Sequence, residues 1–253
     1  MTCHNFKKSF RIASLSGALA FGTVAAFADS FSVTYLAAGV QTPTDTNYYE
    51  TFDNATVSNG ILTTNYNGSP ITGTYSGNFA IVPANLFGGA GGSLYITTTG
   101  HASFYTLSLS QPVNYFGLWF SALDGGNYLN FYNGNSLVES FTPKDFINLV
   151  GPCPGANPFC GNPNNGLDPE EQFAYLNFYD TNGTFNTIVF GETLAPTAEL
   201  ESDNHAVANL ASSPGGTIIP ASEAPEPASL FMVATGIFGL TLAIRRGCPR
   251  RNA

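Results

Sequence analysis

Basic residues are scarce in this chain: its 253 residues include eight lysines and arginines against 17 aspartates and glutamates, a formal net charge of -9. Seven of the eight lie within residues 7–11 and 245–251. Between Asp29 and Glu226 a single lysine, Lys144, therefore stands against all 17 carboxylates, a net charge of -16. A segment this anionic repels phosphate backbones, which excludes nucleic-acid binding, although it could attract cations.

Cysteine and histidine are also few, at four and three. Only Cys153 and Cys160 lie away from the chain ends, in the loop-like stretch GPCPGANPFCGNPNNG. With no other cysteine or histidine nearby, a zinc site is excluded. In an oxidising compartment we predict a Cys153–Cys160 disulfide that contributes about 2 kcal/mol, with a pair of free thiols as the alternative.

Recognisable catalytic signatures are missing, so we assign no catalytic residue. No G-x-S-x-G motif occurs, and GGAGG at Gly88–Gly92 lacks the lysine and helix of a phosphate-binding loop. His205 follows Ser202 and Asp203, but neighbouring residues of a strand point to opposite faces, which argues against a hydrolase triad. We expect SDNH to form a turn at a strand end, its side chains bonded to the backbone.

No long stretch has helical periodicity, and the apolar residues come in short β-branched and aromatic runs between Gly, Asn and Pro. Such runs predict an all-β fold, a single jelly-roll-like β-sandwich over residues 29–208. The eight clearest runs are FSVTYL, SLYITTT, SFYTLSLS, VNYFGLWFSA, NYLNFYN, SLVESF, AYLNFYD and NTIVFGE.

Three local patterns refine this fold. Asp124–Asn127 (DGGN) and Asn133–Asn135 (NGN) predict hairpins, because their residues tolerate positive φ. TPKDFINLV predicts one short helix that Thr142 caps, with Pro143 at its first position. Residues 209–224 have the composition of a poorly ordered linker.

The N-terminus has the three parts of a secretory signal. Lys7, Lys8 and Arg11 precede the apolar residues 12–24, and AFA at 26–28 is a small-x-small cleavage pattern. We expect a signal helix over residues 1–28 that signal peptidase removes before Asp29.

The C-terminus carries an apolar run, Leu230–Ile244, of 15 residues without a charge. As a helix it would rise only about 22 Å, which is marginal for a hydrocarbon core of roughly 30 Å. Arg245 and Arg246 follow it and would remain cytoplasmic, which places the preceding domain outside the membrane.

Pro225-Glu226-Pro227, the apolar run and Arg245-Arg246 together resemble the PEP-CTERM sorting signal, here residues 225–247. The resemblance implies recognition by exosortase, a membrane-embedded transpeptidase-like enzyme of Gram-negative bacteria, with transient membrane attachment and later removal of the helix. The tail at 248–253 is longer than the usual basic ending. A permanent single-pass anchor is the alternative.

A second resemblance covers about residues 45–208. NYFGLWFSALDGGNYLNFYNG, FAYLNFYD and ESDNHAVA are together similar to a globular domain of exosortase-dependent bacterial surface proteins. The resemblance implies an exported, cell-surface or extracellular location. No biochemical activity is attached to that domain.

Two acidic stretches form a candidate metal site. Glu50 and Asp53 lie near the first predicted strands, and Glu201 and Asp203 lie near the last. The first and last strands of a jelly roll are often neighbours, so these carboxylates could meet and hold a structural Ca²⁺. Carboxylates solvated at strand ends are the alternative.

Aromatic side chains offer a second candidate site. Successive side chains of a strand point to opposite faces, so Tyr115 and Trp119 lie on one face of their strand. Phe116, Leu118 and Phe120 lie on the other face, which we predict to be core. Trp119 and Tyr115 then form either edge packing or an outward platform on which sugar rings could stack.

Two functions fit these observations. The first is a non-enzymatic cell-surface or matrix protein that engages extracellular polysaccharide or neighbouring copies of itself. The second is a secreted polysaccharide-active enzyme on a lectin-like sandwich, because convergent carboxylates would suffice for glycoside hydrolysis.

Overall fold

The computed structural model of the protein describes residues 31–100, 102–193 and 198–220. The predicted signal helix, the sorting motif Pro225-Glu226-Pro227, the apolar run and Arg245-Arg246 all lie outside the described residues. Among the residues described, no helix is long and apolar enough to cross a membrane.

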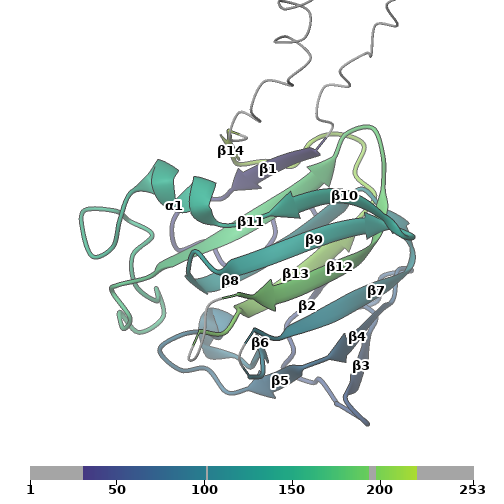
Figure 1. The fold of residues 1–253 in the computed structure, drawn as a ribbon, viewed down its shortest axis with the longest axis horizontal. Helices are drawn as coiled ribbons and strands as arrows, with labels where there is room; N and C mark the ends of the chain where they lie inside the picture. The colour runs from purple at the N-terminus through teal and green to yellow at the C-terminus, as the bar shows by residue number, and fades with distance from the viewer. Residues whose placement is uncertain (1–30, 101, 194–197, 221–253) are drawn as a thin grey trace, which may run out of the picture.

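Two antiparallel sheets form a β-sandwich, which confirms the predicted all-β sandwich (Figure 1). Sheet A contains, in spatial order, β14 (Thr217–Ile219), β1 (Phe31–Tyr35), β11 (Gln172–Asp180), β8 (Tyr115–Leu123), β13 (Glu201–Ala208), β6 (Tyr95–Thr98) and β5 (Phe79–Val82), and β2 (Tyr49–Glu50) pairs with β13. Sheet B contains β10 (Ser136–Phe141), β9 (Asn127–Asn133), β12 (Phe185–Glu192), β7 (Phe104–Val113), β4 (Gly73–Gly77) and β3 (Ile61–Thr64).

All eight predicted runs are strands, because alternating β-branched and aromatic residues suit a half-buried pleated surface. The sequence patterns missed the short strands β2, β3, β4, β5 and β14, which are two to five residues long, and placed a turn within β13. β3, β5 and β14 are edge strands, and short strands depend on their neighbours more than on their own composition.

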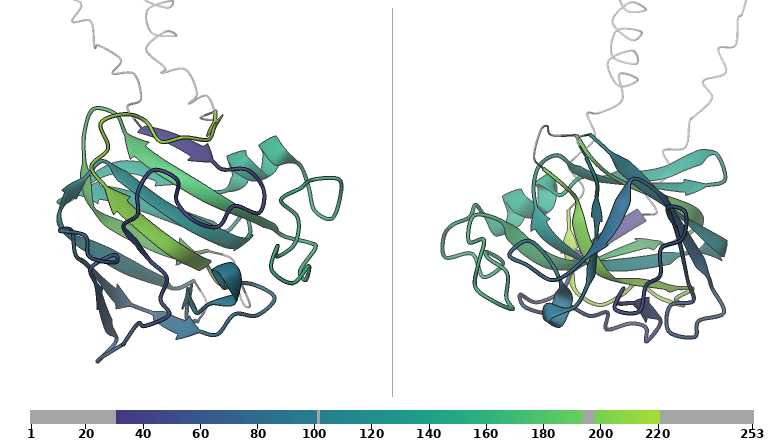
Figure 2. Two further views of the ribbon diagram at one scale, coloured as in Figure 1. Left: turned by 180° about the vertical axis from the view of Figure 1, so that it is seen from behind. Right: turned by 90° about the horizontal axis from the view of Figure 1, so that it is seen from below.

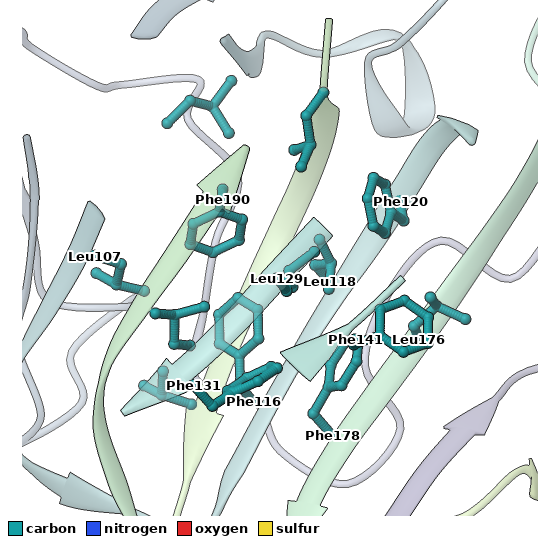
Figure 3. Close-up of a cluster of buried hydrophobic side chains, with 14 of the residues drawn as sticks. Leu107, Phe116, Leu118, Phe120, Leu129, Phe131, Phe141, Leu176, Phe178 and Phe190 are labelled. Atoms are coloured by element: carbon teal, nitrogen blue, oxygen red, sulfur yellow. The ribbon is translucent and has the colours of Figure 1, made fainter. Parts of the chain in front are cut away.

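The core fills the space between the two sheets and is dominated by phenylalanine (Figure 3). Phe116, Leu118 and Phe120 of β8 point into it, as their period predicts, and are fully buried. Phe131 packs on Phe178 with ring centroids 5.0 Å apart, which joins sheet B to sheet A. This contact and its neighbours hold the two layers together.

One of the two predicted hairpins is present. Asn133–Asn135 turns β9 into β10, and Gly134 has the positive φ of 58° that the turn requires. The other prediction is wrong, because Asp124–Asn127 carries the chain from β8 in sheet A to β9 in sheet B. Its tight shape comes from Asp124 Oδ1, which accepts hydrogen bonds from the backbone N–H groups of Gly126 and Asn127.

The predicted helix is present as α1 (Lys144–Val150), with Asp145 in its first turn. Its N-cap residue is Pro143, one position after the predicted Thr142, and no side chain caps it. Phe146 fixes the helix by burying its ring against Tyr35 and Phe159, at 5.2 and 5.3 Å between centroids.

The described part of the predicted linker, residues 209–220, belongs to the sandwich instead. β14 pairs with β1 at the edge of sheet A, with Val33 opposite Ile219. Asn114 anchors the segment further, since its Nδ2 donates to the Leu210 carbonyl at 2.9 Å. The polar composition that indicated a linker is compatible with an edge strand, because only one of its faces is buried.

Loops cover the outer face of sheet A, and Figure 2 shows the segment after β1 crossing it. Asp203 of β13 fixes this layer: its Oδ2 accepts hydrogen bonds from the N–H of Ala90, in the 3₁₀ turn Ala90–Gly92, and from Ser93 Oγ. Gln41, in the segment after β1, joins that segment to the 3₁₀ turn and to β13. Its side-chain Oε1 accepts a hydrogen bond from Gly91 N–H, and its backbone carbonyl accepts one from Asn204 Nδ2, both at 2.7 Å. The central strands β8, β11 and β13 of sheet A are consequently buried on both faces.

The predicted disulfide is present between Cys153 and Cys160, whose Cα atoms are 5.6 Å apart. It closes a short ring in the loop between α1 and β11. Removing the bridge with paired Cys153→Ser and Cys160→Ser changes should lower the free energy of unfolding by about 2 kcal/mol, because the unfolded loop regains its freedom. Urea unfolding of the oxidised protein and the double variant measures this loss, and equal midpoints would contradict it.

Candidate functional site

A polar groove lies between β2 of sheet A and β3, the outermost strand of sheet B. Two hollows of about 470 and 360 Å³ adjoin here, since Glu50, Asn54 and Asn65 line both. We call this the Asn–Thr groove; its remaining lining residues are Tyr49, Thr51, Ala55, Thr56, Leu62, Thr63, Thr64, Asn67 and Thr72.

Glu50 is the one charged residue among those that line the groove. Its strand, β2, pairs with β13 so that Glu50 lies directly opposite His205. Its Oε1 accepts a hydrogen bond from the Phe52 backbone N–H at 2.7 Å, and its Oε2 accepts one from the Thr64 hydroxyl. The carboxylate is thereby fixed in place and retains lone pairs for a further donor.

Most other polar side chains of the groove are uncommitted. Among the described residues, no hydrogen bond joins another residue to the side chains of Asn54, Asn67, Thr51, Thr56, Thr63 and Thr72. Asn65 uses only its Oδ1, which accepts from Gly68 N–H at 3.3 Å, so its amide donors are available. The groove therefore presents a dense set of free amide and hydroxyl groups.

The backbone around the groove is strained but well supported. Phe52, Tyr66 and Asn67 all have positive φ, at 59°, 45° and 58°. Phe52 is held because its buried ring packs edge-on against the rings of Tyr75 and His205. Left-handed conformations of bulky residues cost free energy, so the packing around Phe52 and Tyr66 must hold them in place.

The arrangement suits recognition of a polyhydroxylated ligand. Amides and hydroxyls both donate and accept, as sugar hydroxyls do, and the carboxylate of Glu50 accepts from hydroxyls. With one carboxylate in its lining, the groove does not present the two convergent carboxyl groups of a typical glycosidase.

Of the four residues of the predicted calcium site, the structure places Asp53 near Asp203 but directs Glu50 and Glu201 elsewhere. The strands do meet as expected, with β2 paired to β13, but Glu50 bonds to Thr64 in the groove. Asp53 accepts from Leu94 N–H at 3.1 Å, and burial, with a further contribution from the charge of Asp53, raises the pKa of the Asp203 carboxyl. Within residues 31–100, 102–193 and 198–220, no group of three or more His, Cys, Asp or Glu residues is arranged to hold a metal ion.

Glu201, the fourth residue of the predicted calcium site, belongs instead to a cluster of carboxylates at one end of the central strands of sheet A. We call this cluster the acidic edge; its members are Asp124, Asp168, Glu171, Glu199 and Glu201. Burial, followed by the charges of Glu171, Glu199 and Asp124, raises the pKa of Glu201 well above the usual range. Burial and Asp168 raise the pKa of Glu171 to about 8. These residues are far apart in sequence, and they meet because the C-terminal end of β8 lies between the N-terminal ends of β11 and β13.

The predicted aromatic platform is not present. Trp119 and Tyr115 lie on the face opposite to the core, as their period predicts, but their exposed fractions are only 1% and 0%. Trp119 packs against Phe173 under the loops of the outer layer, and the Tyr115 hydroxyl donates to Asn177 Oδ1. Two-residue periodicity separates the faces of a strand, but it does not reveal that loops cover both of them.

His205 and Ser202 meet in the core, contrary to the expected turn at a strand end. A bulge at Asn204, with φ of 50°, turns both side chains inward, so His205 Nε2 lies 2.9 Å from Ser202 Oγ. His205 Nδ1 lies 3.0 Å from the Tyr75 hydroxyl of sheet B. Because both residues are 0% exposed and Asp203 points to the other face, the pair bridges the sheets and does not form a catalytic triad.

Comparisons with known proteins leave the function open. No protein-family model and no curated protein matches this chain. Among solved structures, the K2 cleaved adhesin domain of Lys-gingipain is similar over 64% of this chain and 97% of that domain, at 16% sequence identity and a TM-score of 0.38.

Proposed function

We propose that this protein is a non-enzymatic, exported cell-surface or extracellular-matrix protein that binds extracellular polysaccharide through the Asn–Thr groove. The observation that carries the proposal is the groove itself, a hollow of about 470 Å³ joined to a second one, lined by amides and hydroxyls that the fold leaves unused. These side chains are mostly exposed and hydrated, so a polyhydroxylated ligand would exchange their hydrogen bonds to water for hydrogen bonds of its own.

The disulfide supports the exported location, because such bonds persist in oxidising compartments. The resemblance of residues 225–247 to the PEP-CTERM signal adds exosortase and signal peptidase as processing partners, with transient attachment to the inner membrane. Mass spectrometry of the native protein tests this part. Loss of residues 1–28 and of everything after about Pro227 supports sorting, whereas an intact Leu230–Ile244 would favour a permanent anchor.

The groove gives the sharpest test of polysaccharide binding. Changing Asn54 to alanine removes an exposed amide that lines both hollows, so binding of glycans on an array should weaken by about five- to tenfold, the value of one neutral hydrogen bond. Asn148→Ala is the matched control, because Asn148 is exposed on α1, away from the groove.

Equal losses in the Asn54 and Asn148 variants would refute the groove as the binding site. A reducing-sugar assay on the same glycans addresses the enzymatic alternative. Binding without release of reducing ends is the expected result, and turnover that one carboxylate substitution abolishes would contradict the proposal.

A further inference from the structure

The charge of the Asn–Thr groove is set by Glu50 alone, which bears on the class of glycan. Its carboxylate receives hydrogen bonds from the Phe52 N–H and the Thr64 hydroxyl, so it cannot swing away from an incoming ligand without losing both. It is half-buried and lines both hollows. Any ligand that occupies the groove therefore contacts a fixed negative charge.

Among the residues that the structure describes, no lysine or arginine lines the groove to offset this charge. Among the described residues Lys144 is the only lysine or arginine, against 14 carboxylates, and it does not line the groove. It lies beside Gly125, in the connection from β8 to β9. An anionic ligand would meet Glu50 without a compensating partner and would also face the net charge of -13 that the described residues carry.

We infer that the Asn–Thr groove selects uncharged polysaccharides and rejects those that carry uronic acid or sulfate groups, and that Glu50 is the residue that determines this selectivity. The inference rests on the proposed function. A sugar hydroxyl donates to the Glu50 carboxylate, whereas a sugar carboxylate can only repel it. Like charges about 4 Å apart in water cost roughly 1 kcal/mol, which corresponds to about fivefold in affinity.

Matched oligosaccharides test the inference directly. The probes are neutral hexose oligomers and the uronic acid oligomers of the same linkage and length, which differ only at C6, and the protein is the full chain. The neutral member of each pair should bind at least about fivefold more tightly. Its affinity should change little between low and physiological salt, because no ion pair contributes.

Glu50→Gln should reduce the preference for the neutral oligomer by about fivefold, since the amide can still accept from Phe52 N–H while its NH₂ donates to Thr64 Oγ1. Glu170→Gln removes the same charge at an exposed site that does not line the groove, and should leave the preference unchanged. If Glu50→Gln fails to fold, Asn54→Asp provides the opposite change, and it should widen the preference.

The outcomes separate the inference from the proposed function. Binding of neutral and uronic oligomers with equal affinity, or an unchanged preference in Glu50→Gln, overturns the charge selection but leaves polysaccharide binding in place. Tighter binding of the uronic oligomers also overturns it. Binding of neither kind of oligomer by the wild-type chain overturns the proposed function itself.

Discussion

Replacing His205 with alanine should lower the free energy of unfolding by about 3–5 kcal/mol, the range found for loss of a large buried ring. The imidazole is fully buried, stacks on Phe190 at 5.3 Å between ring centroids, and links Tyr75 to Ser202. Its removal leaves a cavity and deprives two buried hydroxyls of a partner, and each unsatisfied group adds its own desolvation cost.

Urea unfolding followed by fluorescence measures this effect. Tyr75→Phe removes only the hydroxyl on one side of the imidazole and should cost about 1–3 kcal/mol, which places it between wild type and His205→Ala. Asn148→Ala, exposed on α1, should stay within about 0.5 kcal/mol of wild type. A loss below about 1 kcal/mol in His205→Ala would show that the polar bridge does not hold the two sheets together.

The protein should be more stable at pH 6.5 than at pH 8, by on the order of 2 kcal/mol. Burial raises the pKa of Asp203 to about 8, even though Asn204 N–H, Ala90 N–H and Ser93 Oγ all donate to its carboxylate. The native state thus binds a proton that the unfolded chain, with a carboxyl pKa near 3.8, has released. Stability from this group is complete below pH 3.8 and is lost as the pH rises through 8.

The acidic edge also makes the protein less stable as the pH rises, because the pKa values of Glu171 and Glu201 are raised as well. His205 acts in the opposite direction: burial lowers its pKa to about 3, so the unfolded chain binds its proton first. Its contribution is present above pH 6.5 and is lost as the pH falls from 6.5 through 3. Stability should consequently decline on the alkaline side by loss of the carboxyl protons and in strong acid by protonation of His205.

Urea midpoints at pH 5, 6.5 and 8 test this profile. Asp203→Asn keeps an acceptor for Ala90 N–H but cannot ionise, so its decline between pH 6.5 and 8 should be shallower than that of wild type. Exposed Glu170→Gln should leave the slope unchanged. A wild-type stability that rises from pH 6.5 to 8 would contradict the raised carboxyl pKa values.

The sequence indicated the strands well because their signal is local. Phe116, Leu118 and Phe120 alternate with residues of the other face, and this alternation holds in β8 up to the bulge that follows Phe120. The helix at Lys144–Val150 was equally visible, because an aspartate and a proline at its start favour helix initiation. The Cys153–Cys160 disulfide could be predicted from the number of cysteines and their short separation alone.

Interpretation failed where it had to assign a strand to its sheet or a side chain to its partners. Asp124–Asn127 has the composition of a hairpin, but turn chemistry fixes only the local reversal and does not specify the sheet in which the next strand pairs. Glu50 and Asp203 were expected to share a metal ion, but the bulge at Asn204 and the β2–β13 register direct their carboxylates to different partners.

Composition, period and cysteine spacing by themselves determined that this chain is an acidic, disulfide-bearing β-sandwich, since each depends on residues close together in the sequence. Only the tertiary structure decided that Trp119 is covered, that His205 bridges the two sheets, and that residues 49–72 form a groove of unused amides and hydroxyls. These features arise from contacts between distant segments, and the pairing of β strands, unlike their formation, is set by the packing of the whole domain.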